Sequence, residues 1–578
     1  MLRRVVFSSF IAWSCCLLAS AVAQEINAPQ LDADQDVLEL SPDERRRLFL
    51  ERVGRLGEHY REVPVAKSDA PFATEITNRP RTIRPPVREA SFGQGAFVID
   101  QQSITEKVGI QYLHASPTSE PTVAVRGMEI LVTGNWYAAF STDGGRSFKQ
   151  LDPKSRFETN PKPAVGGDFC CDQIASYDAA TDTMYWFLQG ISNATGNNVR
   201  LKFATGADDI RNLRLRNLDL PSTLYDTAGA YWFDYPDIAF TNRYVYISLN
   251  VFDRPDNTKL SRWKAAVVMR LQKDQLARYE RPSFAKFIET ERGSLRFVQG
   301  ASDTMFWAAH ESNPGNIANF RVRYWRDDQA APSNDVQVAV ENWGNPRSSK
   351  PASWNAKNGR PWLKGIDGRM TAGWLANDIL GFGWTADADN RFRNMHTRIA
   401  LVRAQDVLSA ASGATVQPVA EPHIWSNSLA IVKPAAAPNS LGDVAIAMAY
   451  GGSNNFPGYA VGFLIPTPRQ DRSTPTDWEW GQFTIVAEGN NTQNCRTENG
   501  ELICARWGDY FTVRSHGTDP TTWVTVGYVL TNSDPNEEIR AEATYAWFGL
   551  QGRRIDSSAP GDGPATADAV RRSGARRN

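Results

Sequence analysis

Three aspartates have the type and position to do chemistry, because each opens a short apolar stretch that predicts a β-strand. They are Asp172 in Asp172-Gln-Ile-Ala, Asp237 in Asp237-Ile-Ala-Phe and Asp509 in Asp509-Tyr-Phe-Thr. If these strands gather around one axis, their first residues would form a ring of carboxylates at one mouth. Crowded carboxylates push their pKa values apart, which suits acid–base work on a sugar, or they hold a cation. The alternative is that each aspartate caps a turn or ties strands together through backbone amides.

Two arginines and a tryptophan are the candidate ligand contacts. Arg369 follows Asp367-Gly, and Arg514 lies on a comparable predicted strand. Both could bind an acidic ligand, or they could neutralise the aspartates. Trp507 lies near a predicted strand end, where an indole ring could stack on a sugar while its N–H still forms a hydrogen bond. The alternative for Trp507 is packing between neighbouring units of the fold.

Several other chemistries lack their motifs. The six histidines form no His-x-His or His-Glu-x-x-His pair, which disfavours a zinc hydrolase. The sequence has no phosphate-binding glycine loop, nucleophile elbow or dinucleotide fingerprint. Asp387-Ala-Asp-Asn390 resembles the start of a calcium loop, but the later glycine and bidentate glutamate are missing. We therefore expect no metal or other cofactor, calcium being the one alternative, and predict a polar turn at these residues.

The charge balance limits the classes of partner. Lys and Arg number 63 and Asp and Glu number 64, which gives a net charge of −1. A balance this close to zero argues against nucleic acid or an anionic membrane surface as the main partner. The eighteen tryptophans instead suit contact with sugars.

The sequence predicts different structures for the two ends of the chain than for its middle. Residues 1–23 predict a signal peptide, with Arg3 and Arg4 before an apolar stretch that is too short to span a membrane. The protein is therefore expected to be secreted or periplasmic. Residues 24–104 predict an extension with a helix at about 41–60 and a Pro-rich connection, and residues 553–578 predict a disordered tail.

Four cysteines remain after the predicted signal peptide. Cys495 and Cys504 flank a predicted hairpin with Asn499-Gly500 at its tip, so we predict a disulfide that stabilises by roughly 2–3 kcal/mol. Cys170 and Cys171 are adjacent. They could form a strained vicinal disulfide or remain two buried thiols.

Between residues 105 and 552 the chain repeats one theme, in which a short apolar strand and a turn precede a stronger apolar strand. The stronger strands are Glu129–Thr133, Met184–Leu188, Tyr244–Ser248, Met305–Ala309, Ile379–Gly383, Val444–Met448 and Trp523–Gly527. Their spacing accommodates four strands of about 5–6 residues each plus loops. The repeat predicts an all-β, seven-bladed β-propeller, with six blades as the alternative.

The octapeptide Ser141-Thr-Asp-Gly-Gly-Arg-Ser-Phe148 predicts a tight hairpin between two strands. Its two glycines supply the positive φ such a turn needs, and Asp143 can accept hydrogen bonds from nearby backbone amides. The spacing of Ser141, Asp143, Gly145 and Phe148 resembles the Asp-box of sialidase-like (BNR-repeat) β-propellers. In that superfamily the hairpin is a structural device on the outside of a blade.

With this motif on a blade, the chain resembles the sialidase-like propeller superfamily and a group of exported bacterial propellers of unassigned function. The phrases that carry the second resemblance are Gly167-Asp-Phe-Cys-Cys-Asp-Gln173, Tyr235-Pro-Asp-Ile-Ala239 and Arg506-Trp-Gly-Asp-Tyr510. The superfamily implies the propeller fold and a ligand at the channel mouth. The Arg-Ile-Pro phrase that supplies a sialidase with its first arginine is absent near the start of the predicted propeller.

Three functions follow as expectations. The first is binding of a glycan or other extracellular ligand at the channel mouth. The second is a glycoside hydrolase or lyase that uses Asp172, Asp237 or Asp509 as acid or base. The third is a scaffold within a periplasmic or surface complex.

Overall fold

The computed structural model describes most of the predicted propeller. The described residues are 31–33, 89–93, 95–104, 119–159, 161–227, 229–253, 262–310, 318–344, 346, 350–351, 353–466, 478–493, 495–498, 501–504, 507–532 and 539–550. The expected signal peptide, the helix over 41–60 and the tail over 553–578 lie outside the described residues and stay predictions.

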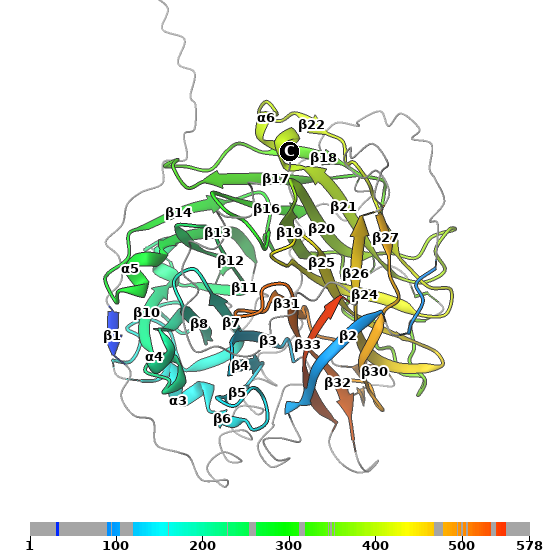
Figure 1. The fold of residues 1–578 in the computed structure, drawn as a ribbon, viewed down its shortest axis with the longest axis horizontal. Coiled ribbons are helices and arrows are strands. Elements are labelled where there is room, and N and C mark those ends of the chain that lie inside the picture. The colour runs from blue at the N-terminus through cyan, green and yellow to red at the C-terminus, as the bar shows by residue number, and fades with distance from the viewer. Residues whose placement is uncertain are drawn as a thin grey trace, which may run out of the picture.

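Seven antiparallel four-stranded units, some extended by a further strand, stand in a ring as the blades of a seven-bladed propeller (Figure 1). Their inner strands surround the central channel: β3 (Thr122–Arg126), β7 (Phe169–Asp178), β11 (Tyr231–Phe240), β15 (Arg296–Phe297), β19 (Met370–Ala376), β24 (Ala430–Pro438) and β31 (Thr512–Ser515). The second strands are β4 (Glu129–Gly134), β8 (Thr183–Gly190), β12 (Tyr244–Asp253), β16 (Thr304–His310), β20 (Ile379–Ala386), β25 (Val444–Gly452) and β32 (Trp523–Thr531). All seven stronger strands predicted from the sequence are these second strands.

Two further strands complete each blade. The third strands are β5 (Tyr137–Ser141), β9 (Asn198–Thr205), β13 (Trp263–Gln272), β17 (Asn319–Arg326), β21 (His396–Arg403), β26 (Asn455–Pro466) and β33 (Arg540–Leu550). The outer strands are β6 (Lys149–Leu151), β10 (Arg216–Pro221), β14 (Phe284–Glu289), β18 (Val336–Ala339), β23 (His423–Ile424), β27 (Trp478–Trp480) with β28 (Thr484–Glu488), and β2 (Ala96–Ser103). Strand β1 (Leu31–Ala33) extends the second blade, and β22 (Thr415–Val416) extends the fourth.

The second strands carry the strongest sequence signal because they are buried on both faces between neighbouring blades. Every residue of β4, β8, β20 and β25 is buried. A strand covered on both faces reads as a continuous apolar run and not as an alternation of apolar and polar residues. The number of these apolar runs in the sequence therefore predicts the number of blades.

The ring is closed by pairing the start of the propeller with its end. Strand β2 pairs antiparallel with β33, from Ala96 opposite Leu550 to Ser103 opposite Thr544, so that blue and red strands lie side by side in Figure 1. The propeller therefore includes residues 96–103, which the sequence analysis placed in the N-terminal extension. The outer strand of a blade is half exposed and carries no continuous apolar run, so its pattern did not separate it from a connection.

Helices are short and lie in connections between strands. They are α3 (Pro153–Phe157), α4 (Ala207–Arg211), α5 (Lys273–Ala277), α6 (Ala404–Ser409) and the 3₁₀ turn η2 (Ser222–Leu224). Within the described part of the chain, none of the helices has the length and apolar character needed to cross a membrane.

The loop after Ser141 joins the two outer strands of the first blade and is held by its own side chains. The Ser141 Oγ accepts the Gly145 N–H at 2.9 Å, and Asp143 accepts the N–H and hydroxyl of Ser147 at 2.9 and 2.6 Å. The bonds from Ser147 lower the pKa of Asp143 to about 2. Gly145 has a φ of 88°, and Phe148 is buried in the core, so the loop is anchored to the blade from both sides.

Cys495 and Cys504 lie directly opposite each other in a two-stranded hairpin formed by β29 (Cys495–Glu498) and β30 (Glu501–Cys504). This is the hairpin that the sequence predicted. The structure describes the backbone here and not the side chains, so the disulfide stays a prediction.

Candidate functional site

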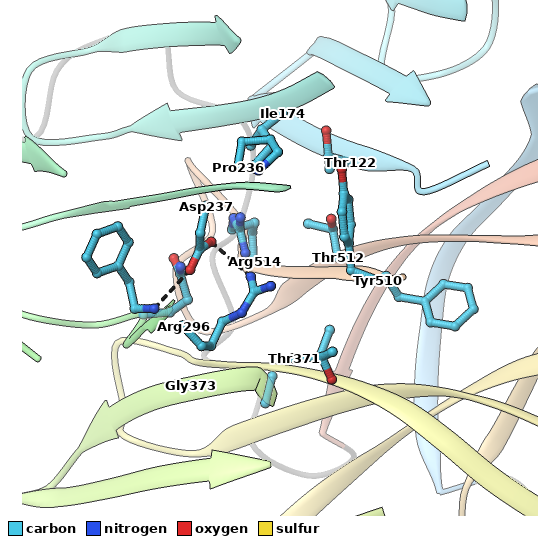
Figure 2. A pocket seen from close by; sticks show the side chains of 15 residues that line it. Thr122, Ile174, Pro236, Asp237, Arg296, Thr371, Gly373, Tyr510, Thr512 and Arg514 are labelled. Atoms are coloured by element: carbon cyan, nitrogen blue, oxygen red, sulfur yellow. Dashed lines mark hydrogen bonds and ion pairs between the residues drawn. The ribbon is translucent and has the colours of Figure 1, made fainter. Parts of the chain in front are cut away.

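A small cavity lies in the central channel, and all seven blades contribute to its wall (Figure 2). One residue from each blade in turn is Thr122, Ile174, Asp237, Arg296, Thr371, Ala435 and Arg514. The cavity volume is about 20 Å³, which is room for about one water molecule. At this level the channel is filled by side chains, and a sugar ring does not fit inside it.

Several inner strands are irregular at their leading ends. Strands β7, β11, β19 and β24 each shift register against their neighbour there. Tyr235 and Lys433 lie inside two of these irregularities with φ values of 53° and 54°, in the left-handed region that non-glycine residues rarely adopt. Such conformations cost roughly 1–3 kcal/mol and concentrate at functional sites, and bulges re-aim side chains. Both side chains join the charged groups at the channel mouth.

Four of these groups form an ion quartet: Asp367, Arg369, Lys433 and Asp509. The Arg369 guanidinium lies 2.7 Å from Asp367 and 2.7 Å from Asp509. The Lys433 Nζ lies 3.0 Å from Asp367 and 3.6 Å from Asp509, and its side chain is 1% exposed. Two cations thus face two carboxylates. The quartet joins the fifth, sixth and seventh blades, and its charges compensate one another.

Next to the quartet, two arginines face one carboxylate. Asp237 pairs with the Arg296 guanidinium at 3.0 Å and accepts the Phe297 N–H at 2.9 Å, so it ties the third blade to the fourth. Figure 2 shows Arg514 beside this pair. Among the described residues Arg514 forms no ion pair within 4 Å; it donates to the carbonyl of Val513 at 3.1 Å, and its Nε has no partner. Burial lowers the pKa of Arg514 to about 10, so it stays charged at neutral pH.

Two tyrosines lie among these charges. The Tyr235 hydroxyl accepts a hydrogen bond from Arg296 at 3.2 Å, and the Arg369 guanidinium lies 4.6 Å from the centre of its ring. The Tyr510 hydroxyl is buried and has no hydrogen-bond partner among the described residues. Burial raises the pKa of both tyrosines, and the charge of Asp172 adds to the rise at Tyr510. Both hydroxyls are therefore protonated at neutral pH.

The structure brings five of the six candidate site residues to one mouth. These are Asp172, Asp237, Asp509, Arg369 and Arg514. Asp237 makes the inter-blade amide contact, and Arg369 neutralises two acids, as the alternative interpretations expected.

Trp507 lies apart from the cavity. It is 1% exposed, its ring stacks on Tyr528 with centroids 4.8 Å apart, and it meets Trp362 edge-on at 5.7 Å. This is packing within the core, so a ligand at the mouth would not contact the indole.

Several members of the mouth were not named as site residues from the sequence: Glu120, Tyr235, Arg296, Asp367, Lys433 and Tyr510. Three of them, Tyr235, Asp367 and Tyr510, lie within two positions of Asp237, Arg369 and Asp509. Lys433 carried a signal of its own, because it is the single charge in the apolar run Ala430–Ala437 and precedes a proline. Glu120 accepts the Asp509 N–H at 2.9 Å. Because the two residues are 389 positions apart, no local sequence pattern predicts this contact.

Cys170 and Cys171, directly before Asp172 on β7, form a disulfide between neighbours. The pair is buried and packs against Trp136 and Ile191. Of the two alternatives that the sequence left open, the structure has the vicinal disulfide and not two thiols.

The chain matches no family model and no curated protein sequence. Solved structures of similar shape exist at low identity. The α-L-arabinofuranosidase Arb93A of Fusarium graminearum is 8% identical, with a TM-score of 0.34, over 78% of this chain and 98% of that one. The sialidase of Trypanosoma rangeli is 10% identical, with a TM-score of 0.34, over 80% and 60% of the respective chains. A Dyadobacter fermentans protein of unknown function is 9% identical, with a TM-score of 0.34, over 79% and 100%. These likenesses concern the fold alone.

Proposed function

We propose that this protein is an exported glycan-binding propeller that recognises acidic sugars at its channel mouth. The observation that carries the proposal is Arg514, a cation that faces the cavity without a carboxylate of its own among the described residues. Two arginines face one carboxylate there, so a ligand anion would complete the balance. A guanidinium binds a carboxylate with planar, directional hydrogen bonds.

The size of the cavity fits the tip of a carboxylate and not a whole sugar. About 20 Å³ admits a group the size of a water molecule. The ligand's acidic group would enter beside Arg514 and the unpartnered Tyr510 hydroxyl, while its ring stays outside. Arg514 retains some solvent exposure, which such an approach requires.

Two contacts at the mouth support our choice of binding over hydrolysis. A sialidase needs a tyrosine whose hydroxyl is paired with a glutamate. Here the Tyr235 hydroxyl accepts a hydrogen bond from Arg296, and the Tyr510 hydroxyl has no hydrogen-bond partner in the described part of the chain, although the charges of Asp172 and Glu120 lie near enough to raise its pKa. Asp237 is held by an arginine and a backbone amide, which leaves it in a structural role. Export is supported by the predicted signal peptide and by the Cys170–Cys171 disulfide, a bond that persists in oxidising compartments.

Calorimetric titration of the purified protein with N-acetylneuraminic, glucuronic and galacturonic acids tests the proposal, with glucose and galactose as neutral comparators. We expect an acidic sugar to bind and Arg514→Met to weaken its binding at least about tenfold, because a charge-assisted hydrogen bond contributes ~1.5–3 kcal/mol. Arg281→Met, at an exposed arginine, is the matched control. Equal binding by wild type and Arg514→Met would overturn the proposal. Turnover of fluorogenic sialosides or arabinosides that Asp237→Asn abolishes would support the hydrolase instead.

A further inference from the structure

A second and larger hollow lies between the fourth and fifth blades. Its volume is about 230 Å³, against about 20 Å³ in the channel. Trp343, which follows β18, forms one wall, and the residues after β20 with the start of β21 form the other. Pockets for drug-sized ligands measure ~300–1,000 Å³, so this one has the size for a single ring and not for an oligosaccharide.

The pocket has a buried floor and an exposed rim. Trp343, Ala386, His396 and Arg398 form the floor, each at most 8% exposed. The rim contains Asn342, Asp387, Ala388, Asp389 and Arg391, all partly or fully exposed. A solute can therefore reach the floor from outside past side chains rich in hydrogen-bonding groups.

Three polar atoms of the floor have no hydrogen-bond partner among the described residues: Trp343 Nε1, His396 Nδ1 and Arg398 Nε. The other His396 nitrogen lies 3.1 Å from His423 Nδ1, which fixes the ring. A buried polar group left without a partner costs roughly 1–3 kcal/mol, and proteins leave few of them. Three in one wall mark this floor as a place where hydrogen bonds within the protein are incomplete, and the open volume above it with its polar rim is what a ligand would occupy.

The cations of the pocket are already paired, and among the described residues the carboxylates outnumber them. Arg398 binds Glu421 at 2.5 Å and the Asn342 carbonyl at 3.1 Å. Arg391 binds Glu341 at 3.0 Å and Asp389 at 3.3 Å. An anion would find no uncompensated cation here, whereas a neutral molecule with several hydroxyls could use both donors and acceptors. The Trp343 ring adds an apolar surface of the kind that packs on a sugar ring.

We propose that this pocket binds a single neutral sugar ring. The inference rests on the proposed function in taking the ligand to be a glycan, but it uses residues separate from Arg514 and the channel. Trp343 contacts Gly368, next to Asp367 of the ion quartet, so the two sites adjoin. A glycan with an acidic and a neutral residue could occupy both.

The test is a titration of the full-length protein with methyl β-galactoside, methyl β-glucoside and methyl α-mannoside, followed by saturation-transfer NMR and tryptophan fluorescence. We expect at least one neutral glycoside to bind. Ala388→Phe, which fills the rim without touching the floor, should weaken that binding at least about tenfold. Trp343→Phe makes the aromatic wall smaller and should weaken it about tenfold. Ala411→Phe, the same change at an exposed position outside the pocket, should bind as wild type does.

Binding of no neutral glycoside, or equal binding by wild type and Ala388→Phe, would overturn the inference. Since Ala388 is on the rim, the titration of Ala388→Phe still tests the inference even where Trp343→Phe does not fold. A parallel titration with N-acetylneuraminic acid separates the two proposals. Acidic binding without neutral binding refutes the pocket alone, and neutral binding without acidic binding refutes the channel alone.

Discussion

The channel mouth and the pocket between the fourth and fifth blades adjoin, yet they use polar residues in opposite ways. At the mouth, charges fill the space and bind one another, which leaves about 20 Å³. In the pocket, about 230 Å³ is open and three floor atoms lack partners among the described residues. Polar side chains that meet one another hold blades together, whereas an open volume with a rim of exposed polar side chains suits a ligand. Arg514 is the exception at the mouth, because it faces the cavity without an ion pair there.

The largest expected effect comes from removing a charge at the mouth. Asp237→Asn should lower the free energy of unfolding by about 3–5 kcal/mol, because it leaves Arg296, whose side chain is only 12% exposed, without its carboxylate. The same change at the pocket rim, Asp389→Asn, should cost less than about 1 kcal/mol, since Asp389 is exposed and its turn amides can be bound by an asparagine oxygen. Urea unfolding of both variants measures the difference. Equal losses would remove the distinction between the two regions.

The pocket floor should make the protein acid-sensitive. Burial lowers the pKa of His396 to about 3, with Arg398 and Arg391 adding to the fall and Asp389 opposing it. The unfolded chain binds a proton near pH 6.5, and the folded one does not until about pH 3. Stability from this group is therefore complete above pH 6.5 and falls as the pH drops below it, by about 2 kcal/mol at pH 5.

His396→Phe keeps the ring contact with Phe392 and removes the titration. Between pH 7 and pH 5, the free energy of unfolding of the wild type should fall by about 2 kcal/mol more than that of His396→Phe. Urea midpoints at several pH values measure this. Parallel curves for the two proteins would mean that His396 does not titrate in this way.

A small effect is expected at the vicinal disulfide beside Asp172. Replacing Cys170 and Cys171 together by serine should lower the free energy of unfolding by about 1 kcal/mol, because a link between neighbours restricts the unfolded chain very little. A loss of several kcal/mol would show that the pair instead anchors the leading end of β7. Thermal unfolding of the double variant against wild type decides this.

The sequence predicted the blades better than the site. The second strands could be predicted because burial on both faces makes each a continuous apolar run. The seven runs correspond to the seven blades. Strand β2 was not read as part of the propeller, because its partner β33 lies more than 400 residues away along the chain. Local pattern carries no information about a pairing at that distance.

At the site, the sequence supplied chemical types but not their contacts. Asp237 and Arg514 line the channel cavity, but which acid meets which base depends on the closure of the ring. Lys433 and Tyr235 are themselves left-handed residues within irregular strands, and they contribute their side chains to the mouth. Their residue types do not predict this backbone conformation. The pocket was missed because its floor comes from two blades, although Asp387-Ala-Asp389 at its rim had been singled out for another reason.

Arg514 is the residue that we propose serves a ligand and not the fold. The most direct test is the free energy of unfolding of Arg514→Met, measured beside Asp237→Asn with no sugar present. Removing a half-buried cation that has no ion pair in the described structure should leave stability unchanged or raise it. A loss as large as that of Asp237→Asn would contradict the account, because it would make Arg514 another structural charge of the channel.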